Sequence, residues 1–102
     1  MLGFLKKLFN GASVNYKELV NSGAIIVDVR SASEYKAGHI PGSKNFPLDT
    51  IRTKVAELKK TNKPVIIVCR SGARSGMAKG ILQSSGIEVY NGGPWTSLKS
   101  KL

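Results

Sequence analysis

The sequence contains one cysteine, Cys69, and one histidine, His39. A single cysteine cannot form an internal disulfide, and the two residues cannot supply the three or four side-chain ligands of a Cys/His metal site. Zinc-finger and haem proteins are therefore excluded, and we expect neither a metal nor another cofactor. The chemistry that remains for a lone cysteine is nucleophilic attack by its thiolate.

Cys69 follows a predicted buried strand, and a short loop containing Gly72 leads from it into a predicted helix. The backbone N–H groups of such a loop form a concave nest for anions, and the helix N-terminus adds free N–H groups and partial positive charge. Arg70 and Arg74 add two permanent cations. We therefore expect the pKa of the Cys69 thiol to lie below its ordinary value, so that the sulfur needs no histidine base.

A cysteine at a strand end can also be a small buried apolar residue without chemistry. Two arginines and a glycine close to the cysteine are poor core material, however, and they favour an oxyanion-binding loop. His39 lies in a predicted loop between Gly38 and Pro41, and we interpret it as a structural hydrogen-bonding residue.

Apolar runs rich in β-branched residues alternate along the chain with segments of helical periodicity. The runs lack polar alternation, which is typical of strands buried on both faces of a parallel sheet. Asn15 with Glu18, and Ser31 with Glu34, have the spacing of capping boxes at the start of short helices. We predict strands over 25–29, 65–68 and 87–90, a turn over 92–94, short helices that end at Gly23 and near Gly38, and further helices over 48–58, over 74–85 and from 95 onward.

This alternation predicts an α/β fold with a mostly parallel central sheet and helices on both faces. Ligands of such sheets bind beyond the carboxyl ends of the strands, so the loops after Val29 and Val68 are expected at the site. A length of 102 residues suits one domain. We assign residues 13–102 to this domain and residues 1–12 to an N-terminal amphipathic extension.

The formal net charge is +10, which favours polyanions, small anions or acidic proteins as partners. Nucleic acid is not expected as the main partner, because the basic residues are scattered and aromatic residues make up only 7% of the chain. No apolar run approaches the length of a membrane span. In residues 1–10 lysines interrupt the apolar residues, unlike in a secretory signal, so we expect a cytoplasmic protein. This segment is expected to pack on the domain or fray, and weak association with a membrane or partner surface is the alternative.

Three segments, in order, resemble the signatures of single-domain rhodaneses over about residues 13–95. The first segment comprises Asp28-Val29-Arg30, Glu34-Tyr35, Gly38-His39-Ile40-Pro41-Gly42-Ser43 and Asn45. The second segment, over 69–75, begins with Cys69 and resembles the active-site loop of that family. The third segment comprises Asn91-Gly92-Gly93 and Trp95.

The resemblance implies a thiosulfate sulfurtransferase, and we expect the protein to be a monomer. Cys69 would take a sulfane sulfur from a small anionic donor such as thiosulfate, carry it as a persulfide, and pass it to a thiophilic acceptor such as cyanide or a thiol. Arg74 is then the expected contact for the oxyanion, and Arg70 is a more exposed steering charge. The substrate-binding loop would comprise Arg70, Ser71, Gly72, Ala73, Arg74 and Ser75, whose N–H groups from Ser71 onward hold the terminal sulfur of the persulfide.

Asp28, Arg30 and Glu34 are interpreted as residues that fix the first strand-to-helix loop by ion pairing and capping, beside the site. Three alternatives stay open at this point: a sulfur carrier that serves a protein or tRNA-modifying system, a rhodanese-like binding module, and a phosphatase or arsenate reductase. The last is disfavoured because only four residues separate Cys69 from Arg74. Cysteine phosphatases of the same fold have a loop one residue longer, which seats a phosphoryl group, and the loop here contains no acidic residue to protonate a leaving group.

Overall fold

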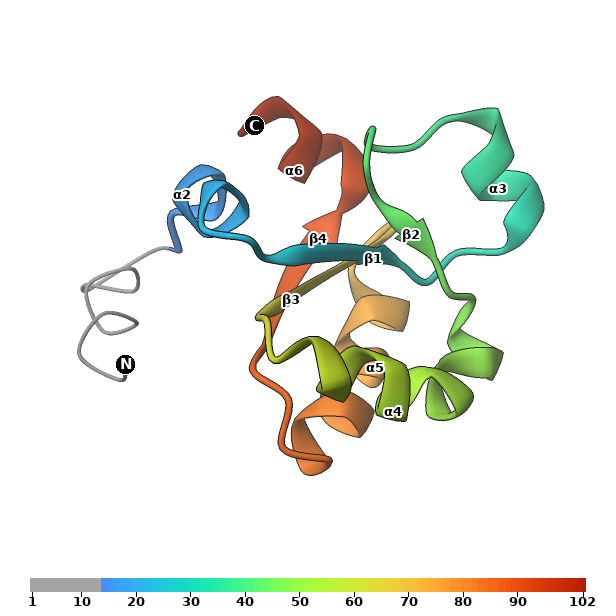
Figure 1. The fold of residues 1–102 in the computed structure, drawn as a ribbon. Coiled ribbons are helices and arrows are strands. Elements are labelled where there is room, and N and C mark those ends of the chain that lie inside the picture. Colours follow the sequence, from blue (N-terminus) through green and yellow to red (C-terminus); the bar gives the residue numbers. More distant parts are fainter. Residues whose placement is uncertain (1–13) are drawn as a thin grey trace.

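The computed structural model of the chain describes residues 14–102, in which four parallel strands form one sheet in the order β2-β1-β3-β4 (Figure 1). All five residues of the central strand β3 are buried, as its apolar sequence requires. The strands are β1 (Ile25–Asp28), β2 (Lys44–Asn45), β3 (Val65–Cys69) and β4 (Val89–Pro94). The N-terminal extension proposed for residues 1–12 lies outside the described residues.

Helices cover both faces of this sheet, which confirms the predicted α/β class (Figure 1). One face packs against η1 (Leu48–Lys54), α4 (Val55–Thr61) and α5 (Ala73–Ser84), and the other packs against α2 (Tyr16–Asn21) and α6 (Trp95–Ser100). Successive residues of β3 alternate between the two cores: Ile67 joins the first, whereas Ile66 and Val68 join the second. Helix α3 (Ala32–Ala37) follows the carboxyl end of β1.

The structure differs from the predicted elements at three places. Strand β2 was not expected, because two residues at a sheet edge carry no apolar pattern. The stripe that predicted one helix over 48–58 belongs to a 3₁₀ helix, η1, followed by α4. Apolar residues three positions apart, such as Leu48 and Ile51, line one side of either helix type, so the pattern could not separate them.

The predicted turn over 92–94 is the carboxyl half of β4. The register shifts there, since Ile67 pairs with Asn91 and Val68 pairs with Gly93, which leaves Gly92 as a bulge residue. A Cβ atom at Gly92 would lie 3.0 Å from the side chains of Ile66 and Val68. Glycine is therefore required by close packing on β3, and it does not mark a chain reversal.

A buried ion pair fixes the loop between β1 and α3. The carboxylate of Asp28 accepts hydrogen bonds from Nε and Nη2 of Arg30 at 2.9 and 2.7 Å, and both side chains are almost fully buried. The same guanidinium donates to the carbonyl oxygen of Gly38 at 2.7 Å and lies 4.7 Å from the Trp95 ring centroid. Asn45 donates from its amide nitrogen to the carbonyl oxygens of Asp28 and Arg30. The ion pair between Asp28 and Arg30 thus ties together β1, β2, the end of α3 and α6.

Replacing Asp28 by alanine should be strongly destabilising, because it leaves the Arg30 guanidinium buried without its counter-charge. We expect a loss of about 3–5 kcal/mol in the free energy of unfolding. Urea denaturation would measure it, with Asp49→Ala as the control, because Asp49 is exposed and should change stability by less than about 0.5 kcal/mol. Equal midpoints for the two variants would show that the ion pair does not hold this loop.

Candidate active site

Cys69 is the last residue of the central strand, and α5 begins only four positions later. Gly72, the residue before α5, has φ +105°, a left-handed conformation that glycine adopts without steric cost. This conformation lets the chain turn sharply from the strand into the helix. The side chain of Cys69 is therefore enclosed between the end of β3 and the first turn of α5, and the residue has no exposed surface.

The backbone N–H groups of this turn point at the Cys69 sulfur. Gly72 N lies 2.9 Å from Sγ and Ser75 N lies 3.4 Å from it. The hydroxyl oxygen of Ser75 lies 3.3 Å from Sγ and accepts from the thiol. The first-turn N–H groups of a helix have no partner within the helix, so they are available to the sulfur. The N–H groups of the loop thus converge on the Cys69 sulfur.

Two opposing effects act on the pKa of the Cys69 thiol. Burial raises this pKa, but the hydrogen bonds from the side chain and N–H of Ser75 and from the N–H groups of Gly72 and Ser71 lower it, and the net effect is a pKa below the usual value. A serine hydroxyl can rotate to donate to a thiolate, so Ser75 serves both protonation states. The thiolate is stabilised by neutral donors, without a histidine.

His39 lies apart from this arrangement. Its Nδ1 is 2.7 Å from the carbonyl oxygen of Tyr35, and its ring stacks on the Tyr35 ring at a centroid distance of 3.8 Å. The hydroxyl of Tyr35 in turn donates to the carbonyl oxygen of Ser43. These contacts agree with the structural role that the sequence suggested.

Asn91 of β4 holds the Cys69 loop through side-chain hydrogen bonds. Its Oδ1 accepts from the Ser75 hydroxyl at 2.6 Å and from the N–H of Gly93 at 2.9 Å, and its amide nitrogen donates to the carbonyl oxygen of Gly72. Asn91 therefore positions the Ser75 hydroxyl, which is hydrogen-bonded to the Cys69 sulfur. The sequence analysis gave this residue no role, and its only signal was its place in the third segment resembling rhodaneses.

Arg74 forms an ion pair with Glu34 of α3. Its Nη1 and Nη2 donate to the two carboxylate oxygens at 2.8 and 3.0 Å. The Arg74 hydrogen bonds lower the pKa of Glu34 to about 2, and the same contacts raise the pKa of Arg74. Glu34 also completes a capping box with Ser31, as predicted. The sequence analysis placed both residues near the site, but it did not pair them.

The remaining loop residues differ in their exposure. Arg70, Ser71 and Ala73 are exposed, Gly72 and Arg74 are half-buried, and Ser75 is fully buried. The loop therefore presents Arg70 to solvent beside the buried Cys69, and within residues 14–102 this arginine has no ion-pair partner. The guanidinium of Arg70 is thus accessible to solvent, whereas the Cys69 sulfur is not.

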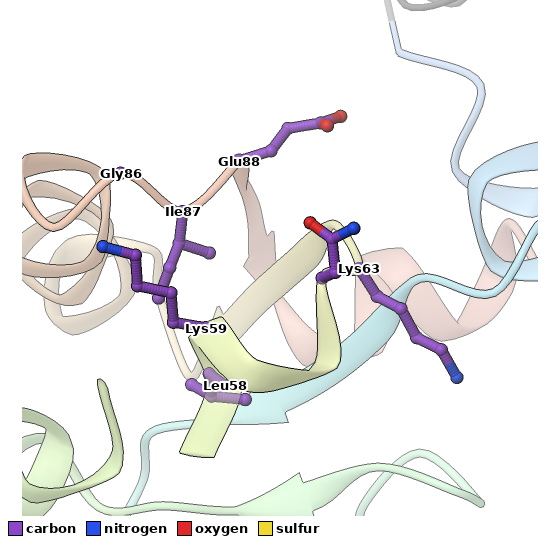
Figure 2. A pocket seen from close by; sticks show the side chains of 7 residues that line it. Leu58, Lys59, Lys63, Gly86, Ile87 and Glu88 are labelled. Carbon is purple, nitrogen blue, oxygen red and sulfur yellow. The ribbon is translucent and has the colours of Figure 1, made fainter. Parts of the chain in front are cut away.

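Two hollows of about 340 Å³ each flank the sheet at opposite ends. One lies beside the loop and is lined by Arg74 together with Val29, Ser31, Pro47, Leu48 and Asp49. The other lies at the amino ends of β3 and β4, where Figure 2 shows the Lys59 amino group reaching toward Gly86 while Glu88 points away. Only the first is next to the Cys69 loop.

Within residues 14–102, no group of three or more His, Cys, Asp or Glu side chains is placed to hold a metal ion. Over the same residues, no helix has the length and apolar character needed to cross a membrane.

Comparison of the chain with known proteins identifies its family. A family model described as rhodanese-like domain matches residues 13–94. The chain is 40% identical over 68 residues to the thiosulfate sulfurtransferase GlpE of Pseudoalteromonas translucida, a match that covers 66% of this chain and 64% of that protein. It is 38% identical over 63 residues to the putative sulfur carrier protein YrkF of Bacillus subtilis, covering 62% of this chain and 34% of that one. The chain thus spans less than two thirds of either relative.

Among solved structures, a rhodanese with anions from E. coli superposes with a TM-score of 0.68 at 31% sequence identity. The match covers 74% of this chain and 91% of that one.

Removing the Ser75 hydroxyl should raise the pKa of Cys69, because the side chain of Ser75 makes the largest favourable contact to the thiolate. In Ser75→Ala the pH profile of iodoacetamide alkylation should shift to higher pH. Ser71→Ala is the matched control in the same loop, since Ser71 acts through its backbone N–H, and its profile should stay at the wild-type position. A larger shift in Ser71→Ala than in Ser75→Ala would contradict this account of the site.

Proposed function

Because the chain belongs to the rhodanese-like domain family, we propose that it is a sulfurtransferase that forms a persulfide on Cys69. The donor supplies a sulfane sulfur, as thiosulfate does, and the acceptor is thiophilic, such as cyanide or a thiol. The observation that carries this proposal is the convergence of the Gly72 and Ser75 N–H groups on the sulfur at the end of the central strand. We propose no cofactor for the reaction.

The reaction divides into two displacements at sulfur. In the first, the Cys69 thiolate attacks the outer sulfur of thiosulfate, a new S–S bond forms, and sulfite leaves with the electron pair of the broken S–S bond. In the second, the acceptor attacks the terminal sulfur of the persulfide, and the Cys69 thiolate leaves. Neither step needs an external oxidant or reductant. The N–H groups of residues 71–75 stabilise negative charge on sulfur in both steps.

The first displacement brings two anions together, so positive charge near the loop must offset their repulsion. Arg70 is exposed and can steer a donor toward the loop. Arg74 uses two of its five N–H donors on Glu34 and keeps three for an oxyanion. Since Cys69 has no exposed surface, a donor reaches Sγ only when the loop or its neighbours shift.

A sulfur carrier for a protein acceptor is the second candidate, favoured by the similarity to the putative sulfur carrier YrkF. This role keeps the Cys69 persulfide and changes only the acceptor. Turnover with small thiols supports the enzyme, whereas transfer only to a macromolecule supports the carrier.

Replacing Cys69 by serine should abolish persulfide formation, because the chain has no second cysteine. Intact mass spectrometry after incubation with thiosulfate should show one added sulfur atom on the wild type, removable by cyanide, and none on the variant. A serine variant that still gains sulfur would refute the mechanism.

The same two proteins can be assayed with p-nitrophenyl phosphate. No turnover is expected, since the four residues between Cys69 and Arg74 form a small ring of N–H groups that suits a sulfur atom better than a phosphoryl group. Cys69-dependent hydrolysis faster than sulfur transfer would favour the phosphatase alternative.

Replacing Arg74 by alanine should lower kcat/KM for thiosulfate by about 10- to 150-fold, the range expected for a lost charge-assisted hydrogen bond. The variant also leaves the Glu34 carboxylate without its counter-charge beside the loop. Arg70→Ala should lose less, because Arg70 is exposed and acts at longer range. Steady-state kinetics of the two variants beside Arg52→Ala, an exposed arginine of η1, would test the order, and an equal or larger loss in Arg70→Ala would reverse the assigned roles.

A further inference from the structure

The pair between Glu34 and Arg74 has a consequence for the charge of the donor. The carboxylate occupies both terminal nitrogens of the guanidinium, and the side chains are only about one-third exposed, at 31% and 36%. Glu34 therefore partly offsets the positive charge of Arg74 where a donor anion must approach.

The other charges around the loop leave this balance unchanged. Asp28 and Arg30 form a second pair of opposite charges, and both residues are buried. Arg70 is the one cation of the segment 69–75 without an ion-pair partner in the described part of the chain, and it is exposed. A dianion entering the loop thus meets two cations, Arg70 and Arg74, and the carboxylate of Glu34 reduces their combined attraction.

Coulomb energy grows with the product of the charges, so Glu34 repels a dianion more than a monoanion. When thiosulfate reacts, the thiolate and the donor together bring three negative charges to the loop. When a singly charged organic persulfide R–S–S⁻ reacts, they bring two. In that case the thiolate attacks the outer sulfur, a new S–S bond forms, and R–S⁻ leaves with the electron pair of the broken bond.

We infer that Glu34 is a specificity-determining residue that shifts donor preference away from doubly charged thiosulfate and toward singly charged organic persulfides. The inference rests on the proposed function, because it concerns the donor that loads Cys69. It assigns Glu34 a role beyond the capping of α3.

Glu34→Gln isolates the charge from the other contacts of this side chain. Oε1 of Glu34 accepts from the N–H and hydroxyl of Ser31 at 3.1 and 3.0 Å, and from Nη1 of Arg74. A glutamine keeps this oxygen, and glutamine serves as well as glutamate in a capping box. Only the negative charge and the bond from Nη2 of Arg74 are lost.

The test compares kcat/KM for thiosulfate and for 2-hydroxyethyl persulfide, a monoanion, in wild type and variants. In Glu34→Gln the ratio of thiosulfate to persulfide should rise about three- to tenfold, mainly through a lower KM for thiosulfate. High salt should shrink this rise, because screening weakens the repulsion. Glu34→Asp keeps the charge and should keep the wild-type ratio.

Glu18→Gln is the matched control, since Glu18 holds the same capping position in α2 and its loss changes the net charge equally. Its ratio should equal that of the wild type. If the wild type gains sulfur from both donors but Glu34→Gln leaves the ratio unchanged or lowers it, the inference is overturned and the proposed function stands. If the wild type gains sulfur from neither donor, both fall together.

Discussion

The convergence of backbone N–H groups on one sulfur atom is the constraint on which the rest of the site depends. Gly72 N and Ser75 N reach Sγ of Cys69 only because the strand ends at the cysteine and the helix starts four residues later. Burial alone would raise the pKa of this thiol, and the hydrogen bonds reverse that effect. Neutral N–H and O–H dipoles of the fold therefore favour the thiolate, a task that a neighbouring base performs in many cysteine enzymes.

Both sides of the loop are held by elements distant in sequence. From β4, Asn91 holds the Ser75 hydroxyl and the carbonyl oxygen of Gly72, and the bulge at Gly92 sets its register. On the other side, the buried Arg30, which is paired with Asp28, donates to the carbonyl oxygen of Glu34. The carboxylate of Glu34 in turn forms the ion pair with Arg74 of the loop. A loop pinned from two sides keeps its N–H groups aimed at the sulfur with little conformational entropy left to lose.

The net charge of +10 does not describe the electrostatics of the site. Arg30 and Arg74 are paired with carboxylates, whereas Arg70 faces solvent and has no ion-pair partner in the part of the chain that the structure describes. The loop thus combines a stabilised thiolate with modest positive charge. This balance suits the proposed reaction, in which the site admits one anion and later releases another.

The parallel α/β fold and the place of Cys69 at a strand end before a helix could be predicted from the amino-acid sequence, because buried runs, capping residues and glycines act locally. The pairing of Arg74 with Glu34 and the contact of Asn91 with the loop are visible only in the folded chain. Arg74 meets Glu34 across 40 positions, and Ser75 meets Asn91 across 16. Strand β2 and the continuation of β4 through Gly92 likewise depend on neighbouring strands, since their own residues carry no apolar periodicity. Such pairings are set by the order of strands in the sheet, which no local pattern encodes.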